Sequence, residues 1–258
     1  MTETGSLSVR LTGSEQDLLA SQRLRYKVFV EELGASGPDA DHARKLESDR
    51  FDVHFDHLLL VDSNRNQDTL EHVVGVYRLL RHDVAAEECG FYSASEFDLS
   101  PLVRSGRNLV ELGRSCVHPD YRGGSAIFHL WNGLADYVLS HEIEIMFGVA
   151  SFHGTDTTKL LNPLSYLHCR HLAPESLRVS SLQVNALPRR IPCDQVDVSA
   201  ALRSIPPLLK SYLRLGGFVG EGVFVDHDFN TTDVCLILDT HRMMEGRRER
   251  YVRVRGAQ

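Results

Sequence analysis

The chain has 258 residues, of which 42% are hydrophobic and 24% are charged, a balance typical of a globular protein with a sizeable core. Its 28 Lys and Arg against 35 Asp and Glu give a formal net charge of −7, which disfavours a nucleic-acid binder. The longest stretch without a charged side chain, residues 123–135, is too short to cross a bilayer. The first ten residues lack the basic start and apolar core of a signal peptide, so we expect a cytoplasmic protein.

In chain order, residues 6–12 alternate as a strand does, and residues 15–32 carry apolar side chains at helical spacing. Residues 34–56 are polar and longer than a usual connection, which predicts a functional or mobile loop. Two apolar segments, 57–62 and 72–81, flank a polar turn and predict a hairpin.

Residues 109–117 and 143–150 read as strands on either side of a helix over 125–140, the pattern of a parallel pair with a crossover helix. Helices are then expected over 157–171 and 207–215, and strands over 218–225 and 233–238. This mixed order predicts an α/β (α+β) fold with a mixed central sheet and helices on both faces. We expect one domain over residues 1–240 and a basic tail over 241–258.

The five cysteines are scattered and odd in number, with no C-x-x-C pair, so we expect reduced packing residues and neither a disulfide nor a zinc framework. The histidines form no H-E-x-x-H or similar ligand set, and no metal site is predicted. The tail carries six arginines against two glutamates. It is either a solvated end or an electrostatic dock for an acidic partner or an anionic membrane surface.

The most informative string is residues 111–125, ELGRSCVHPDYRGGS. It places Glu111 and Arg114 on a strand, then a turn with Arg122, Gly123, Gly124 and Ser125 before a helix. Glycines between a strand and a helix let backbone N–H groups point at an anion, aided by the helix dipole. The alternative is an ordinary tight turn.

Taken together, the string resembles motif A of the GNAT superfamily of acyltransferases, in which an R/Q-x-x-G-x-G/A loop holds the phosphate end of a pantetheine carrier. The resemblance implies a GNAT-like fold and a donor site at Cys116, Val117, Arg122, Gly123, Gly124 and Ser125. Here the glycines are adjacent and residues 125–127 stand where the second glycine is expected. That departure favours the single phosphate of acyl carrier protein over the pyrophosphate of coenzyme A.

The first half of the chain is similar to the acyl-homoserine-lactone synthases, through Arg25, Phe29, Asp49, Asp52, Asp56, Arg78, Glu111 and Arg114 in that order. The second half looks closer to another branch, through SFHG at 151–154, LSYLH at 164–168 and LLKSYLRLGGF at 208–218. The combination resembles the L-ornithine Nα-acyltransferases of bacterial ornithine-lipid synthesis. The resemblance covers nearly the whole chain, from Arg25 to Asp239.

This resemblance implies transfer of a 3-hydroxyacyl chain from acyl carrier protein to the α-amine of L-ornithine, giving lyso-ornithine lipid. The donor substrate is then acyl-phosphopantetheine, with no permanently bound cofactor, and the partners are acyl carrier protein, the amino acid and the inner face of the inner membrane, by peripheral contact. Glutamine, lysine or glycine as acceptor, or an acyl-homoserine-lactone-type signal synthase, stay open as alternatives. A membrane-active lysin is disfavoured by the lack of a spanning segment, and a catalytically inactive carrier-binding module is a third class.

The chemistry needs a group that takes a proton from the attacking amine, because an amine that is mostly protonated at neutral pH is a poor nucleophile. Glu111 is the first candidate, as base or as an anchor for the ammonium. Three apart on an ideal strand, Glu111 and Arg114 face opposite sides, so both reach one site only if the strand bulges. Arg25, Arg78 and Arg114 are expected to hold the acceptor carboxylate or to fix Glu111.

The remaining candidates rest on weaker patterns. A backbone N–H near Cys116 and Val117 is the expected donor to the tetrahedral oxyanion. Tyr212 either protonates the departing thiolate, as the family pattern implies, or is a packing residue. His153 is a candidate for proton transfer, and Asp49 or Asp52 for the second ammonium of ornithine. Phe29 is a candidate wall for the acyl chain.

Overall fold

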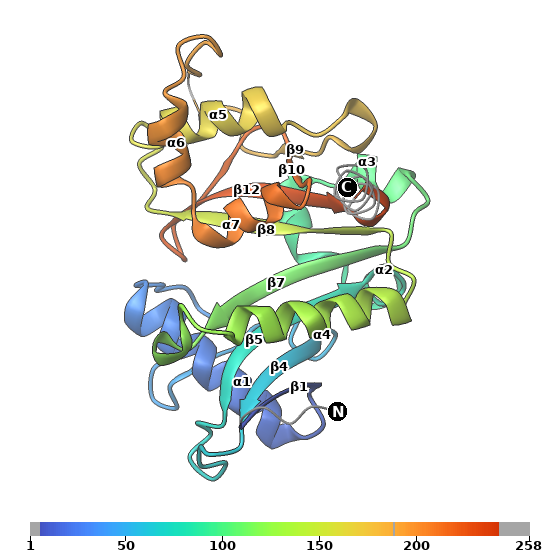
Figure 1. Ribbon diagram of the computed structural model, residues 1–258, viewed down its shortest axis with the longest axis vertical. Helices are drawn as coiled ribbons and strands as arrows, with labels where there is room; N and C mark the ends of the chain where they lie inside the picture. Colours follow the sequence, from blue (N-terminus) through green and yellow to red (C-terminus); the bar gives the residue numbers. More distant parts are fainter. Residues whose placement is uncertain (1–5, 188, 243–258) are drawn as a thin grey trace, which may run out of the picture. The chain divides into compact units, whose positions relative to one another are not determined.

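The computed structural model describes residues 6–187 and 189–242 (Figure 1). Within them the chain divides into two compact units that interleave along the sequence. Unit 1 takes the residues up to Phe91, together with Glu111–Glu142 and His227–Asn230, and unit 2 takes Tyr92–Val110, Ile143–Asp226 and the residues from Thr231 on. Of the expected basic tail, all but His241 and Arg242 lies outside the described residues. None of the helices in the described part of the chain combines the length and apolarity that a membrane span requires.

The sheet of unit 1 follows the strand order β1-β4-β5-β7. β1 pairs antiparallel with β4, and β4 pairs antiparallel with β5 through an irregularity between Leu60 and Val61. The strands are β1 (Leu7–Leu11), β4 (Asp56–Asp62), β5 (Val73–Arg81) and β7 (Leu109–Val117), of which Glu111 onward belongs to unit 1. The predicted hairpin over 57–62 and 72–81 is confirmed to within a residue at each end.

Helix α1 (Glu15–Arg25) begins where the Ser14 hydroxyl accepts a hydrogen bond from the Asp17 N–H. It continues as the π-helical segment η1 (Tyr26–Glu32), so the predicted helix over 15–32 is confirmed in extent although its second half is wound differently. Leu24 and Val28 on this helix pack on Leu59 and Val76 of the sheet in one hydrophobic cluster.

Helix α4 (Ala126–Ser140) packs on β1, β4 and β5. A Cβ atom at Gly133 would lie 2.4 Å from Val9 and 3.3 Å from Leu58, so only glycine allows α4 to approach this closely. Because β4 sends Leu58 toward α4 and Leu59 toward α1, both faces of the sheet are covered. This arrangement confirms the expected helices on both faces within unit 1.

The long polar segment of unit 1 is largely irregular, as predicted. Its only regular pairing within the described residues is β2 (Ala40–Asp41) with β3 (Leu46–Glu47). The Ser48 N–H donates to the Asp39 carbonyl at 2.9 Å, which folds the segment back on itself. The rest of unit 1 comprises α2 (His82–Val84), η2 (Ala85–Cys89) and η4 (Pro119–Tyr121).

Unit 2 is built around β8 (Ile145–His153) and β12 (Thr231–Asp239), which pair antiparallel over their full lengths. The other edge of β12 pairs with β10 (Phe218–Val219) and β11 (Phe224–Asp226). The unit also contains α3 (Ser100–Arg104), α5 (Leu161–His171), α6 (Val198–Ser204), α7 (Pro207–Arg214), the turns η3 (Tyr92–Ser95) and η5 (Glu175–Leu177), and the pair β6 (Phe97–Asp98) and β9 (Ser180–Ser181). The expected single strand over 218–225 is therefore two short strands.

The cysteine prediction is wrong at two positions. Cys169 at the end of α5 and Cys193 form a disulfide with a Cα–Cα distance of 5.7 Å. The loop that carries Cys193 is held against α5, because the Ile191 N–H donates to the Ser165 hydroxyl at 2.9 Å. Cysteine spacing along the chain contains no trace of this tertiary contact. Cys89, Cys116 and Cys235 are not in a disulfide, as expected.

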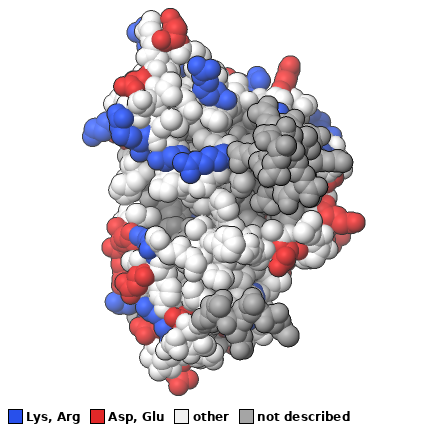
Figure 2. Space-filling model, viewed as in Figure 1, with Lys and Arg blue, Asp and Glu red and all other residues white. Residues whose placement is uncertain are grey.

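Surface charge is mixed in sign. On the face shown in Figure 2, Lys and Arg side chains lie among Asp and Glu side chains, in keeping with a modest net charge of −7. Most of the buried Asp, Glu and Arg side chains among the described residues belong to unit 1.

Candidate active site

Two fully buried arginines organise the polar segment of unit 1. Arg25, at the end of α1, donates to Asp52 at 2.6 Å and to Glu47. Arg78, on β5, donates to Asp49 at 2.7 Å and to Asp52 at 2.6 Å. Both side chains are 0% exposed. Their hydrogen bonds therefore hold the polar segment, through Glu47, Asp49 and Asp52, against α1 and β5.

Arg114 joins the same network from β7 because the strand bulges at this residue. Its φ of 47° lies in the left-handed region, which breaks the alternation of the strand. The guanidinium donates to Glu47 at 2.9 Å, to Asp49 at 3.2 Å and to Asp39 at 3.3 Å. The bulge is the condition under which Glu111 and Arg114 were expected to reach one side of the strand.

Glu111 lies two residues before Gly113, so the two share a face of β7. A Cβ atom at Gly113 would lie 3.8 Å from Phe55 and 3.9 Å from the Arg78 guanidinium. Glu111, which is 1% exposed, therefore faces the side of the sheet that holds the arginine network. Burial raises the pKa of the Cys89 thiol, and the negative charge of Glu111 raises it further.

The network keeps its carboxylates ionised despite burial. Burial alone would raise the pKa of Glu47, but Arg114 and Arg25 outweigh it and lower that pKa to about 2. The pKa values of Asp49 and Asp52 are also below the usual range, because Arg78 at Asp49, and Arg25 with Arg78 at Asp52, outweigh burial. Burial instead lowers the pKa of His57 and raises that of Asp39.

The three arginines face four carboxylates, which are Asp39, Glu47, Asp49 and Asp52. Asp39 differs from the others because its side chain is 30% exposed, whereas that of Glu47 is 1% exposed. Three of these carboxylates, Asp39, Glu47 and Asp49, are close enough together to hold a metal ion, but Arg114 contacts all of them and already places a cation among them.

The glycine turn after β7 is open. Gly123 has a φ of 77°, and a Cβ atom there would meet nothing within 4 Å. Ser125 makes no side-chain capping bond to α4. Arg122 donates to the Val117 carbonyl at 3.0 Å and holds Glu32 through two bonds of 2.5 and 2.7 Å. This arginine is thus bound to η1, while Gly123 and Gly124 present only backbone.

The remaining predicted site residues have other surroundings. Cys116 is buried in the cluster under α1, and burial raises the pKa of its thiol to about 12, so only its backbone is available for chemistry. Phe29 packs edge-on against Phe229 with ring centres 6.2 Å apart. Tyr212, buried on α7, and His153, exposed at the end of β8, belong to unit 2. Their expected roles stay predictions.

Sequence reasoning missed Glu47 and Asp39, which complete the network. The available signal was the density of acidic residues in the long polar segment, but nothing in its spacing distinguishes Glu47 from its neighbours. Sequence reasoning also missed His57. Its Nε2 lies 3.0 Å from the Asp52 carbonyl oxygen, and its Nδ1 lies 3.3 Å from the Ser21 hydroxyl.

Comparisons with known proteins agree with this arrangement. Residues 24–132, which include every residue of the network, match the family model of the acetyltransferase (GNAT) domain. The chain resembles the solved structure of FeeM, an N-acyl amino acid synthase from uncultured soil microbes, with a TM-score of 0.50 and 11% identity over 93% of this chain and 94% of that one. The protein is therefore an acyltransferase with a GNAT-like fold.

Curated relatives narrow the family. The chain is 57% identical to the L-ornithine N(alpha)-acyltransferase of Rhodobacter capsulatus, over 96% of this chain and 95% of the relative. It is 40% identical to the Brucella abortus protein of the same name, over 98% of this chain and 90% of the relative. The chain belongs to the L-ornithine Nα-acyltransferase family.

Proposed function

We propose that this protein transfers a 3-hydroxyacyl chain from acyl carrier protein to the α-amine of L-ornithine, giving lyso-ornithine lipid, the first step of ornithine-lipid synthesis. The observation that carries the proposal is the 57% identity along nearly the full length of a relative with that acceptor in its name. The donor substrate is the acyl-phosphopantetheine of the carrier, and no cofactor stays bound between turnovers.

In the proposed reaction the amine nitrogen attacks the thioester carbonyl, an amide bond forms and the C–S bond breaks. Glu111 takes the proton that the amine loses, directly or through a water molecule. A backbone N–H near Cys116 and Val117 stabilises the oxyanion, and Tyr212 returns a proton to the thiolate. The burial of Glu111 on the network face of β7 supports its role, because it keeps bulk water away from the carboxylate that receives the proton.

A cationic acceptor also suits the charge of the network. Four carboxylates against three arginines leave one negative charge uncompensated, and the exposed member is Asp39. Asp49 and Asp52, the residues expected from the sequence to meet the second ammonium of ornithine, are already bound by buried arginines. In the proposal these two position the acidic segment, and Asp39 is the carboxylate that reaches the acceptor.

The alternatives share the same chemistry. Glutamine, lysine or glycine as acceptor, or a signal synthase of the acyl-homoserine-lactone type, would use the same base and the same donor. The names of the curated relatives favour ornithine over all four. Because the product is an amphiphile, we further propose peripheral contact with the inner face of the inner membrane, from a cytoplasmic location.

The test is an assay of the purified chain with 3-hydroxyacyl-carrier protein and a panel of free amino acids, with mass spectrometry of the products. Ornithine should give N-acyl-ornithine at a rate well above glutamine, lysine and glycine. Product formed only with another amino acid would replace ornithine in the proposal, and no product with any amino acid would reject the acyl transfer.

The same assay tests the base. Glu111→Gln removes the proton acceptor and should lower kcat/KM by at least about 100-fold. Glu87→Gln, at an exposed carboxylate of unit 1, is the matched control and should leave the rate unchanged. Circular dichroism checks that both variants fold. A folded Glu111→Gln enzyme of normal rate would remove Glu111 from the mechanism.

A further inference from the structure

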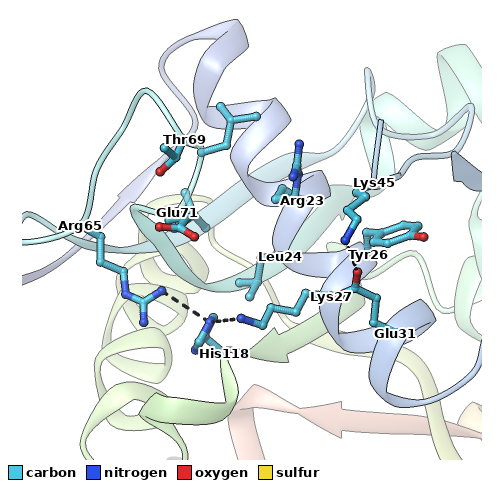
Figure 3. Close-up of a pocket in the computed structure, with 12 residues that line it drawn as sticks. Arg23, Leu24, Tyr26, Lys27, Glu31, Lys45, Arg65, Thr69, Glu71 and His118 are labelled. Carbon is cyan, nitrogen blue, oxygen red and sulfur yellow. Dashed lines mark hydrogen bonds and ion pairs between the residues drawn. The ribbon is translucent and has the colours of Figure 1, made fainter. Parts of the chain in front are cut away.

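Unit 1 contains a second polar site, which is lined by none of the side chains of the buried network. It is a pocket of about 170 Å³ between α1, η1, the β4–β5 loop and the residue that follows β7 (Figure 3). Its basic side chains are Arg23, Lys27, Lys45, Arg65 and His118, and its acidic ones are Glu31 and Glu71. Neither the glycine turn nor Glu111 lines it.

The positive charge of the pocket is only partly compensated from within. Lys45 pairs with Glu31 at 3.1 Å, and Arg65 reaches Asp120 at 3.3 Å, although Asp120 is 70% exposed. Arg23 has a buried Nε with no hydrogen-bond partner among the described residues. Glu71 is then the only carboxylate of the lining left against Arg23 and Lys27, so a positive site exists on a chain of net charge −7.

His118 is held rigidly at the floor of this pocket. Its backbone N–H donates to the Val74 carbonyl at 2.8 Å, and its ring packs edge-on against Tyr121 with centres 5.8 Å apart. Its Nδ1 lies 3.2 Å from the Asp120 backbone nitrogen. The side chain is therefore positioned by contacts that do not involve the pocket.

The other ring nitrogen faces cations. Lys27 Nζ lies 2.7 Å from His118 Nε2, and Arg65 Nη1 lies 3.5 Å from the same atom (Figure 3). The Lys27 ammonium has donors only, so a contact of 2.7 Å is a hydrogen bond in which His118 Nε2 accepts from Lys27. Lys27 keeps its other N–H donors, and Arg65 brings its own N–H groups to the same side of the His118 ring. An anion beside the ring would accept from Lys27 and Arg65 together.

We propose that this pocket binds a phosphate group, presented either as free phosphate or as the headgroup of an anionic lipid. A phosphate offers three or more acceptor oxygens, whereas a carboxylate offers two. The larger number matches the basic side chains that line the pocket from three segments of the chain, which are Arg23 and Lys27 on the helical stretch, Lys45, and Arg65. The pocket is also open on one side, which leaves room for the rest of an esterified phosphate. The proposal is independent of the acyl-transfer mechanism.

The first test is calorimetric titration of the full chain with inorganic phosphate at constant ionic strength, with acetate in a parallel titration. Lys27→Ala and Arg65→Ala should each weaken phosphate binding about tenfold, since each removes a charged donor. Lys159→Ala, at a lysine that is 82% exposed in unit 2, is the matched control and should bind as the original chain does. The His118 ring signals in NMR spectra should shift on addition of phosphate.

Equal phosphate affinity in all variants, or His118 signals that do not move, would overturn the proposal. Acetate that binds as tightly as phosphate would also overturn it. Because Lys27 is an exposed side chain, its variant should fold normally, and a thermal melt verifies this. Neither readout depends on catalysis, so failure of the acyl-transfer proposal would leave this result intact.

A second measurement distinguishes the two sources of phosphate. Vesicles of phosphatidylcholine with phosphatidylglycerol should capture the chain more strongly than pure phosphatidylcholine if the ligand is a lipid headgroup. Lys27→Ala should then lose that difference while Lys159→Ala keeps it. Capture that is the same on both vesicles, together with phosphate binding that depends on Lys27, would assign the pocket to free phosphate.

Discussion

The buried arginines of the network and the basic residues of the pocket behave in opposite ways, as two neighbours on one helical stretch show. Arg25 ends α1 and points inward, where it is fully buried and held by Glu47 and Asp52. Lys27, two residues later, lines the pocket, and its Nζ lies 2.7 Å from His118 Nε2. Lys27 has no carboxylate partner among the described residues. The first charge is neutralised within the protein and serves architecture, whereas the second is available to a ligand.

This comparison shows what burial demands of a charge. A buried guanidinium is tolerated only when carboxylates and hydrogen bonds replace the water that it loses. Arg25, Arg78 and Arg114 have their charge balanced by sharing Glu47, Asp49 and Asp52. Their hydrogen bonding is incomplete, because Nη2 of Arg25 and Nε and Nη2 of Arg78 have no partner among the described residues. An exposed side chain of the pocket, such as that of Lys27, stays hydrated and needs no carboxylate partner. An excess of positive charge is therefore stable there until a ligand neutralises it.

The sharpest way to break the comparison is to remove one charge from each group. Arg78→Met leaves Asp49 and Asp52 with fewer partners in a buried site, and we expect a loss of about 3–5 kcal/mol in the free energy of unfolding. Lys27→Met removes an exposed charge and should change that free energy by less than about 0.5 kcal/mol. Chemical denaturation measures both. Losses of similar size in the two variants would contradict the division.

Acid should weaken the buried network over a defined range of pH. The pKa of Glu47 is lowered to about 2 in the folded protein, so its stabilising effect is complete above its ordinary pKa of 4.5 and disappears as pH falls toward 2. Asp49 and Asp52 act in the same direction, whereas Asp39 acts in the opposite one, since burial raises its pKa.

We therefore expect the free energy of unfolding to fall by about 2–3 kcal/mol between pH 4.5 and 2. Urea denaturation at a series of pH values measures it. Lys27→Met serves as the control and should show the same fall, because Lys27 is outside the network. A flat profile over this range would show that the carboxylates are not held ionised by their arginines.

The exposed ion pair between Arg122 and Glu32 should have the smallest effect. Their side chains are 42% and 37% exposed, so water competes with the pair even though its geometry is bidentate. Arg122→Ala should change the free energy of unfolding by less than about 1 kcal/mol. A thermal or chemical melt measures this, and a loss above about 2 kcal/mol would place Arg122 with the buried group.

Much of the fold was predictable because it depends on periodicity. The strand over 109–117 has the predicted bounds, and the hairpin and α4 differ from prediction by about a residue. Alternation and helical spacing report which side of an element is apolar, and hydrophobic burial then selects the element. The short strands β2, β3, β6 and β9 escaped prediction, because their pairing depends on partners distant in the chain or on tight local turns.

The candidate site was predictable in its residue types and not in its connections. Arg25, Asp49, Asp52, Arg78 and Arg114 do meet, but as partners of one another, with Glu47 and Asp39 added. The sequence could state that a bulge was needed for Arg114 to join Glu111 on one side of the strand. It could not show that the bulge exists, since a single left-handed residue leaves no periodic signal.

By itself, then, the amino-acid sequence determined the order of the main elements, the apolar faces and the family, because these are written in short-range patterns and in residue identities at matched positions. Only the tertiary structure decided which charges are buried, which cysteines are bonded and where the basic side chains of the pocket come together. Ion pairing, a disulfide and a pocket each depend on distances between segments far apart in the chain, and those distances are set by packing.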